Sequence, residues 1–426
     1  MNIALSATGL AVMLGITLGW THRLHAVVGA ACGAAVLAAG GLITAADVTT
    51  TVSVMWRPLV TITSVMLMTA CARHVGLFSV FAEVVEPYTR GPVRRAFAVV
   101  FALSALTASL LSNDAAILVL TPTVIALLRT VYPRRHGKFT LAFSFAVFYA
   151  AGVAPLVTSN PMNVVVASHA GIAFNAYALR MIPIALVGWL IAYYFLAREF
   201  AAELEDEAPA IGAWPEARAR LGTGGLLMLI AMAGVMLAYP IISFLDGPLW
   251  AVAAAGASVG VVAALGVTAP AGRREAARSI SRDVSWDLLP LLAAVLLLAS
   301  GLARAGVVDV LARLYHDGAT ALPTVGVVSA LGAATINNHP MAMLGTLAAE
   351  RAGGDMHLVL AGLIGGDLGP RLAPIGSLAG LMWISMLRRH GIGLSIRRFI
   401  IIGAKVTVPC LAASLAMLWL MQYAGW

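Results

Sequence analysis

Long, nearly uninterrupted apolar runs constrain this chain more than any other feature of its sequence. About ten stretches approach the roughly 20 apolar residues that a helix needs to cross a bilayer. Of the 426 residues, 61% are hydrophobic and only 11% are charged, whereas soluble domains carry about 25% charged residues. The sequence therefore predicts an all-α polytopic membrane protein and excludes a soluble globular fold.

The cysteines and the net charge of +8 carry little chemical information. Cys32, Cys71 and Cys410 lie inside apolar segments, and their spacing matches neither a metal motif nor a disulfide framework. In a membrane protein, Lys and Arg gather in cytoplasmic loops, so the basic balance indicates topology and not nucleic-acid binding. We expect no metal and no cofactor. No basic residue precedes the first apolar run, so we expect no cleaved signal peptide.

Basic residues at both ends of one apolar block, 96–131, predict a re-entrant hairpin. Two arginines at 94 and 95 precede the block, and basic residues at 134, 135 and 138 follow it. A single crossing would place these groups on opposite sides of the membrane. A hairpin with its tip near Asn113 places both groups on the cytoplasmic side, where basic residues are favoured.

With a second hairpin at 321–349, the distribution of Lys and Arg agrees with the positive-inside rule along the chain. The prediction includes a crossing helix at 58–72, an interfacial stretch at 75–89 and a cytoplasmic loop at 272–283. It places 20 of the 27 Lys and Arg residues on the cytoplasmic side and five outside. Both termini are then periplasmic, in a bacterial cytoplasmic (inner) membrane.

The same count predicts two inverted-topology repeats, each with five transmembrane helices and one re-entrant hairpin. Ser104, Ala105, Leu106 and Ala108 recur as Ser329, Ala330, Leu331 and Ala333, at a constant offset of 225. An odd number of crossings inverts the second repeat, an arrangement typical of secondary transporters. The predicted units are an N-terminal repeat (1–199), a cytoplasmic linker (200–220) and a C-terminal repeat (221–426). The broken helices fall at 139–168 and 356–387.

Four polar clusters interrupt the apolar segments. They are the two hairpin tips (112–114 and 337–340) and the two helix breaks (155–163 and 365–377). Polar groups in hydrocarbon cost several kcal/mol unless they are paired, and irregular backbone is tolerated there only where it lines a cavity. We therefore expect the four clusters to meet at mid-membrane and form a binding site.

The residue types in these clusters suit a small ligand with hydroxyl groups. Amide side chains both donate and accept hydrogen bonds. The predicted substrate-binding residues are Asn113, Asn160, Asn163, Asn338, Ser159 and Ser377. The predicted proton-coupling residues are Asp114, Asp367, Arg371 and His339. Two readings remain open: Asp367 and Arg371 form a local pair that caps broken helices, and His339 is a structural hydrogen-bonding residue.

The clusters resemble the ArsB arsenite/antimonite efflux permeases of the ion transporter superfamily. The segment from Gly366 to Ser377 (GDLGPRLAPIGS) is similar to the most recognisable stretch of that family. The segment from Ser112 (SNDAAILVLTPTVIA) is similar to its first hairpin, and Ser159–Asn163 and Asn337–Asn338 follow in the expected order. Arg371 stands where the resemblance leads us to expect Lys.

The resemblance implies a secondary active exporter and not an enzyme. Its cargo would be trivalent arsenic or antimony, As(OH)3 or Sb(OH)3, expelled from the cytoplasm in exchange for protons. The absence of cysteine from the four clusters argues against a thiolate arsenic site. The expected partners are the substrate, protons and lipid, and some members of the family also pair with a soluble ATPase. The alternative is a sodium-coupled dicarboxylate or sulfate symporter of the same superfamily, which predicts more basic side chains near the site.

Overall fold

The computed structural model describes residues 8–13, 15–16, 23–89, 91–132, 137–205, 222–316, 318 and 320–426, and all regular secondary structure among them is helical. Eight helical segments in this part of the chain are long and apolar enough to cross a membrane by length and composition. The prediction of an all-α multi-pass membrane protein is therefore confirmed. Most of residues 2–20, where the first apolar run lies, and most of the predicted linker at 200–220 are outside the described residues.

The first half of the chain begins with α2 (Arg23–Ala39) and the 30-residue helix α3 (Ala45–His74), followed by the short α4 (Leu77–Thr89). The predicted limits of 58–72 for the third helix were wrong. Pro58 is accommodated inside the helix, and its beginning is fixed by a capping box in which Thr44 and Asp47 bond reciprocally. Arg304 adds two hydrogen bonds of 2.5 and 2.7 Å to the Asp47 carboxylate.

Two antiparallel helices, α5 (Val93–Leu110) and α6 (Asn113–Val131), occupy the predicted hairpin at 96–131. A broken helix follows, in which α7 (Gly137–Ala150) is separated from α8 (Pro161–His169) by irregular backbone and the one-turn helix η1 (Val157–Ser159). The half ends with the long helix α9 (Phe174–Glu199).

From its hairpin onward, the second half has the same order of elements as the first. It comprises α10 (Thr223–Phe244), α11 (Leu249–Gly266), α12 (Arg273–Asp283), α13 (Leu288–Arg304) and α14 (Val307–Tyr315). The helices α15 (Ala321–Ile336) and α16 (Asn338–Arg351) occupy the second predicted hairpin, 321–349. The second broken helix is α17 (Met356–Leu368), the turns η3 (Gly369–Arg371) and η4 (Pro374–Gly376), and α18 (Leu378–Arg389), and α19 (Ile396–Tyr423) is last.

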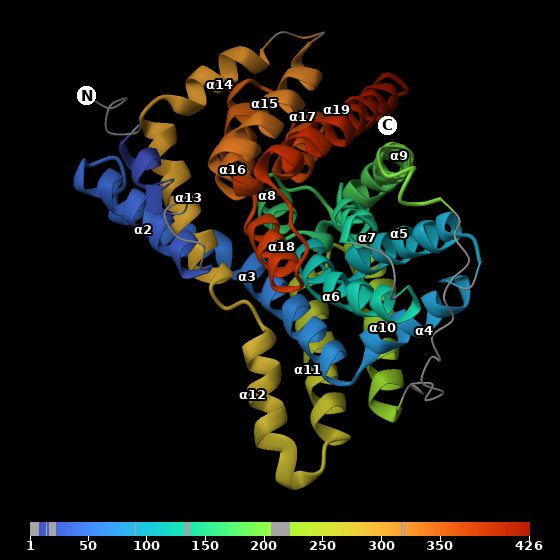
Figure 1. Ribbon diagram of the computed structural model, residues 1–426. Helices are drawn as coiled ribbons and strands as arrows, with labels where there is room; N and C mark the ends of the chain where they lie inside the picture. The colour runs from blue at the N-terminus through green and yellow to red at the C-terminus, as the bar shows by residue number, and fades with distance from the viewer. Residues whose placement is uncertain are drawn as a thin grey trace.

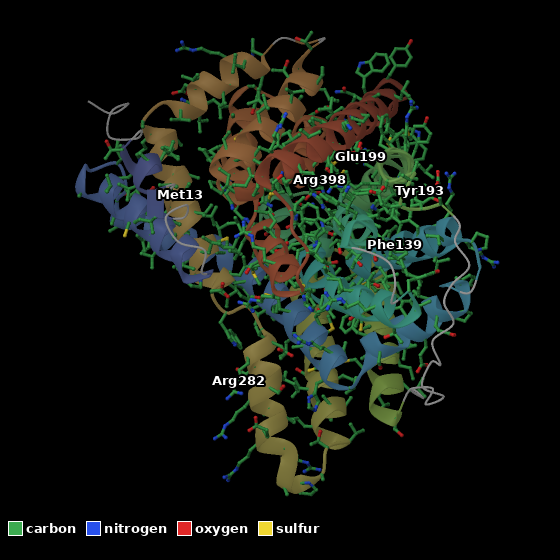
Figure 2. The ribbon with its side chains drawn as sticks, in the orientation of Figure 1. Met13, Phe139, Tyr193, Glu199, Arg282 and Arg398 are labelled. Atoms are coloured by element: carbon green, nitrogen blue, oxygen red, sulfur yellow. The ribbon has the colours of Figure 1, made fainter. Side chains whose placement is uncertain are left out.

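The segment 273–283 was predicted as a loop and is the helix α12. Its arginines lie on an exposed surface, and Glu275 lies within 3.8–4.0 Å of Arg278 and Arg282, which supports a solvated helix. Together with the adjoining end of α11 it projects beyond the other helices (Figure 1). The side chain of Arg282 points away from the bundle (Figure 2).

Two helix contacts are close to the site, one between the halves and one within the second half. The long helices α9 and α19 pack against each other along their length. Within the second half, α15 and α17 approach so closely that a Cβ at Gly365 would overlap the carbonyl oxygen of Gly326, and one at Gly369 would overlap that of Ala330. Small residues at helix contacts permit this approach in lipid, where packing drives association.

Candidate functional site

The Asp367 carboxylate is the centre of the polar cluster formed by the two helix breaks. Asp367 is the last charged residue of α17 and is buried. Its oxygens accept from the backbone N–H of Ala154 (3.0 Å) and from the side-chain amides of Asn160 (2.7 Å) and Asn163 (3.2 Å). Ala154 and Asn160 lie in the break between α7 and α8, and Asn163 lies in the first turn of α8, so one carboxylate of the second half organises this part of the first.

Tyr177 extends this cluster and was not predicted. Asn163 donates a second hydrogen bond to the Tyr177 hydroxyl at 2.7 Å, and that hydroxyl donates to the carbonyl of Ala154 at 3.0 Å. No sequence pattern pointed to it, because Tyr177 lies near the start of α9, outside every polar cluster. The Asn163 carbonyl oxygen is buried and has no hydrogen-bond partner among the described residues.

Arg371 lies beside this carboxylate, but its guanidinium bonds to backbone carbonyls. Its Nη2 donates to the carbonyls of Phe148, at 3.0 Å, and Ala151, and its Nη1 donates to the carbonyl of Asp367. These carbonyls are at the C-terminal ends of α7 and α17, where a helix leaves acceptors unpaired and favours a cation. Arg371 therefore neutralises both broken ends, which agrees with the capping reading more than with a carboxylate pair.

The first hairpin also contacts the α7–α8 break. The Asn113 amide donates to the carbonyl of Gly152 at 3.2 Å, and the Ser159 hydroxyl donates to the carbonyl of Ser109 at 2.8 Å. Asn113 and Ser159 are thus brought next to the Asp367 cluster, as expected of one shared site.

The two hairpin tips and the two helix breaks share an N-cap arrangement that the sequence did not reveal. Each marks the N-terminus of a helix, and its N-cap side chain accepts a backbone N–H of the first turn. The caps are Ser112 of α6 (3.2 Å), Asn160 of α8 (3.1 Å), Asn337 of α16 (3.2 Å) and Ser377 of α18 (3.0 Å). The remaining N–H groups of a helix N-terminus attract electronegative atoms.

Asn338 and His339 form a pair at the tip of the second hairpin. The Nδ1 of His339 lies 2.8 Å from the side-chain Oδ1 of Asn338, while its Nε2 is buried without a partner among the described residues. No described hydrogen bond joins Asn338, His339 or Ser377 to Asp367, so the structure does not gather all predicted site residues into one network.

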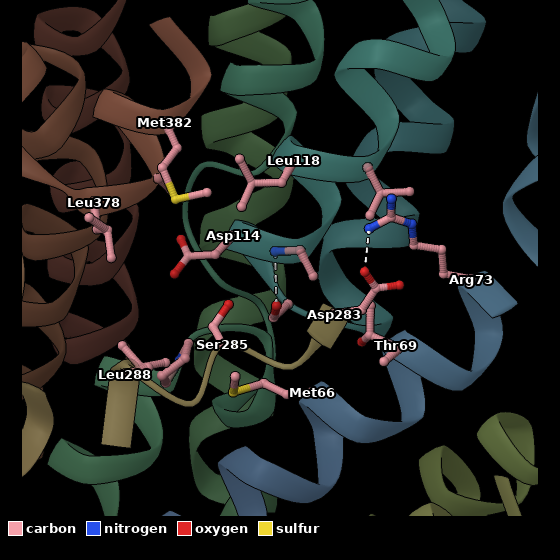
Figure 3. A pocket seen from close by; sticks show the side chains of 16 residues that line it. Met66, Thr69, Arg73, Asp114, Leu118, Asp283, Ser285, Leu288, Leu378 and Met382 are labelled. Atoms are coloured by element: carbon pink, nitrogen blue, oxygen red, sulfur yellow. Dashed lines mark hydrogen bonds and ion pairs between the residues drawn. The ribbon is translucent and has the colours of Figure 1, made fainter. Parts of the chain in front are cut away.

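Asp114 faces a separate cavity of about 110 Å³. The N-terminal turns of α6, α8 and α18 border it through Ala115, Pro161 and Ala379, and α3 and the α12–α13 connection complete the wall. Figure 3 shows the side chains of Asp114 and Ser285 directed into this space. Arg73 of α3 and Asp283 of α12 form an ion pair of 3.2 Å at its edge. We call this cavity the α6 cleft.

Eight apolar segments of membrane-spanning length, together with two broken helices that meet at an amide-rich polar cluster, define the described part of the chain as a multi-pass membrane transporter. A family profile described as arsenical pump membrane protein, ArsB, matches residues 9–422, and the chain belongs to this family.

Comparison with individual proteins agrees with this assignment. The chain is 29% identical over 424 residues to an arsenical pump membrane protein of Escherichia coli, covering 95% of this chain and 94% of that protein. It is 26% identical over 431 residues to an uncharacterized transporter of Mycobacterium tuberculosis, covering 95% of each. Its fold is similar to that of the Alcanivorax borkumensis YdaH transporter, with a TM-score of 0.61, 16% identity and coverage of 89% and 88%.

Proposed function

We propose that the chain exports trivalent arsenic as neutral As(OH)3, or antimony as Sb(OH)3, from the cytoplasm in exchange for protons, in the bacterial inner membrane. The observation that carries the proposal is the cluster around Asp367. The side-chain amides of Asn160 and Asn163 converge there at the capped N-terminus of α8, and the family relatives are named arsenical pumps. Hydroxyl groups bonded to arsenic can donate to carbonyl oxygens and accept from amide N–H groups.

The arrangement of cations supports a neutral cargo. The Nη groups of Arg371 are engaged with backbone carbonyls, and Arg73 at the edge of the α6 cleft is paired with Asp283. An anion symporter would use such arginine forks to bind carboxylate or sulfate. This distribution favours a metalloid hydroxide over the sodium-coupled anion alternative.

The two carboxylates receive different roles in this proposal. Asp367 is surrounded by three N–H donors, so taking up a proton would displace one of them. Asp114 lies at the N-terminus of α6 and faces the α6 cleft. We assign proton exchange to Asp114 and the organisation of the amide cluster to Asp367.

For the transport cycle we propose two inverted repeats whose hairpin-bearing units move against scaffold helices. The recurrence of hairpin, broken helix and long last helix in both halves supports this. In this arrangement the α6 cleft opens to the cytoplasm, both termini are periplasmic, and the basic surface of α12 is available to a soluble ATPase.

Arsenite uptake into everted vesicles tests the function. An imposed pH gradient, acid inside, should drive uptake, and a sodium gradient at constant pH should not. Sensitive cells that express the chain should grow in arsenite and hold less intracellular arsenic than cells with an empty vector. Uptake of sulfate or a dicarboxylate that depends on sodium, without arsenite transport, would replace this proposal by the alternative.

A further inference from the structure

A pocket of about 380 Å³ lies between the beginnings of α7 and α19 and shares no lining residue with the α6 cleft. We call it the α7–α19 pocket. Both halves of the chain line it. The first half supplies Gly137, Lys138 and Leu141, all in α7, and the second half supplies Ile392, Gly393 and Arg398. A ligand in this pocket would therefore contact both halves.

Lys138 and Arg398 make the pocket basic, and no acidic residue is among the described residues that line it. Neither cation forms an ion pair with another described residue. Lys405, two turns further along α19 than Arg398, differs in this respect, since its Nζ lies 2.7 Å from the Glu199 carboxylate. Two cations that border one space without a counter-charge repel each other and favour an anion between them.

The pocket also lies at two helix N-termini. Gly137 is the first residue of α7, and Arg398 lies in the first turn of α19, where its backbone N–H donates to the Ser395 Oγ at 3.2 Å. Neither first turn contains an acidic residue. The N–H groups at the start of a helix carry partial positive charge and commonly bind phosphate. The helix ends therefore add to the field of the two side chains.

The wall supplied by the second half is held by the first hairpin. The Nη2 of Arg129, in the last turn of α6, donates to the carbonyl of His390, where the α18–α19 connection begins. Leu141 and Ile392 are buried and supply apolar lining. The two cations thus border a recess with fixed walls, and they are not simply neighbours on an open surface.

The surroundings of Arg398 favour a lipid headgroup over a soluble anion. Ile401 lies three residues after Arg398 on α19, on the same face of the helix and one turn further into its apolar part. Its side chain is exposed, as are those of Ile396 and Ile400. An amphiphile can place its phosphate at Arg398 and an acyl chain against Ile401, whereas inorganic phosphate gains nothing from the apolar surface.

We propose that the α7–α19 pocket binds the phosphodiester headgroup of an anionic phospholipid, which contacts Lys138 of the first half and Arg398 of the second. In the topology proposed above, the pocket is at the cytoplasmic surface, where basic residues meet anionic lipid. The bound lipid links the two halves at this surface and stabilises their contact. This inference does not depend on the identity of the cargo.

Melting of the purified protein in detergent, followed as phospholipid is added, tests the site. A ligand that binds the folded state raises its melting temperature. Dioleoylphosphatidylglycerol should do so in a saturable way, and dioleoylphosphatidylcholine, which has the same acyl chains and no net charge, should not. Inorganic phosphate at the same concentration should have no effect. Native mass spectrometry should show phosphatidylglycerol retained on the parent protein.

The decisive variants are Lys138→Gln and Arg398→Gln, each of which removes one charge from the pocket. Each should raise the phosphatidylglycerol concentration that gives half of the melting shift about 5-fold, the usual effect of one cation near anionic lipid. The matched control is Arg397→Gln. Arg397 is the neighbouring cation in the same helical turn and is exposed, but it does not line the pocket. This variant should bind phosphatidylglycerol like the parent.

Equal weakening by Arg397→Gln and Arg398→Gln would mean that the general basic surface attracts the lipid, and it would overturn the site. A shift with phosphatidylcholine as large as that with phosphatidylglycerol would do the same. A shift produced by inorganic phosphate alone overturns the lipid occupant and assigns the pocket to a soluble anion.

Lys138→Gln and Lys138→Arg decide the inference even if Arg398→Gln does not fold, because Lys138 is exposed at the start of α7. Weaker binding in Lys138→Gln together with parental binding in Lys138→Arg supports the site. Parental binding in Lys138→Gln overturns it.

Discussion

Replacement of Asp367 by asparagine tests the central cluster most directly. The substituted amide keeps the shape of the carboxylate but has one accepting oxygen and one N–H2 group. Asn160 cannot rotate its amide to accommodate the change without losing its N-cap bond to Met162. Asn163 can rotate, because its carbonyl oxygen has no partner, but it then gives up its 2.7 Å bond to Tyr177.

The expected loss of stability follows from these hydrogen bonds. At least one charge-assisted hydrogen bond, worth about 1.5–3 kcal/mol, is lost, and one buried donor or hydroxyl is left unpaired at a cost of about 1–3 kcal/mol. We therefore expect Asp367→Asn to destabilise the protein by about 3–5 kcal/mol. The loss should appear as a clearly lower melting temperature of the detergent-solubilised protein, measured by fluorescence-detected size exclusion after heating, and as loss of arsenite transport.

Asp309→Asn is the matched control. Asp309 forms an ion pair of 3.0 Å with Arg351 on the surface, and both side chains are substantially exposed. Exposed pairs contribute about 0–1 kcal/mol, so this variant should melt close to the parent. Equal melting temperatures of Asp367→Asn and Asp309→Asn, with normal transport by both, would refute the reasoning about the carboxylate cluster.

Three further variants probe other features. Asp114→Asn should melt like the parent, yet arsenite uptake into everted vesicles should no longer respond to an imposed pH gradient; an unchanged response would remove Asp114 as the proton group. Gly365→Ala forces a methyl against the carbonyl of Gly326 and should lower the yield of folded protein, whereas Gly234→Ala, with open space around it, should not; equal yields would contradict the close α15–α17 contact. Arg73→Gln removes the ion pair at the edge of the α6 cleft and should increase thiol labelling of Ser285→Cys in everted vesicles; reduced labelling would contradict its position at the edge.

The sequence predicted the helical segments because charge and hydropathy are local properties. The block at 96–131 was divided correctly into two helices, since the basic residues at its ends and the polar residues near Asn113 are both visible in the sequence. The predicted start of α3 at residue 58 was too late, because the capping box at Thr44 stabilises an earlier beginning. The helix α12 was missed because it is polar on most of its surface.

The site was predicted in its residue types but not in its pairings. Asn160, Asn163 and Asp367 were expected to meet, and they do. The carbonyls that Arg371 binds and the contact of Tyr177 with Asn163 depend on how helices distant in sequence pack. No pattern along the chain encodes this packing.

Both charged groups in the contacts of Asp367 and Arg371 come from the second half. The second half supplies an anion for the buried N–H groups of the α7–α8 break and a cation for the carbonyls at the end of α7, while the first half contributes only neutral groups to these contacts. The halves are thus complementary and not interchangeable. Among relatives, substitutions at positions 148–163 should co-vary with those at 367–371, and a charge introduced into the first break should be tolerated only with a compensating change in the second.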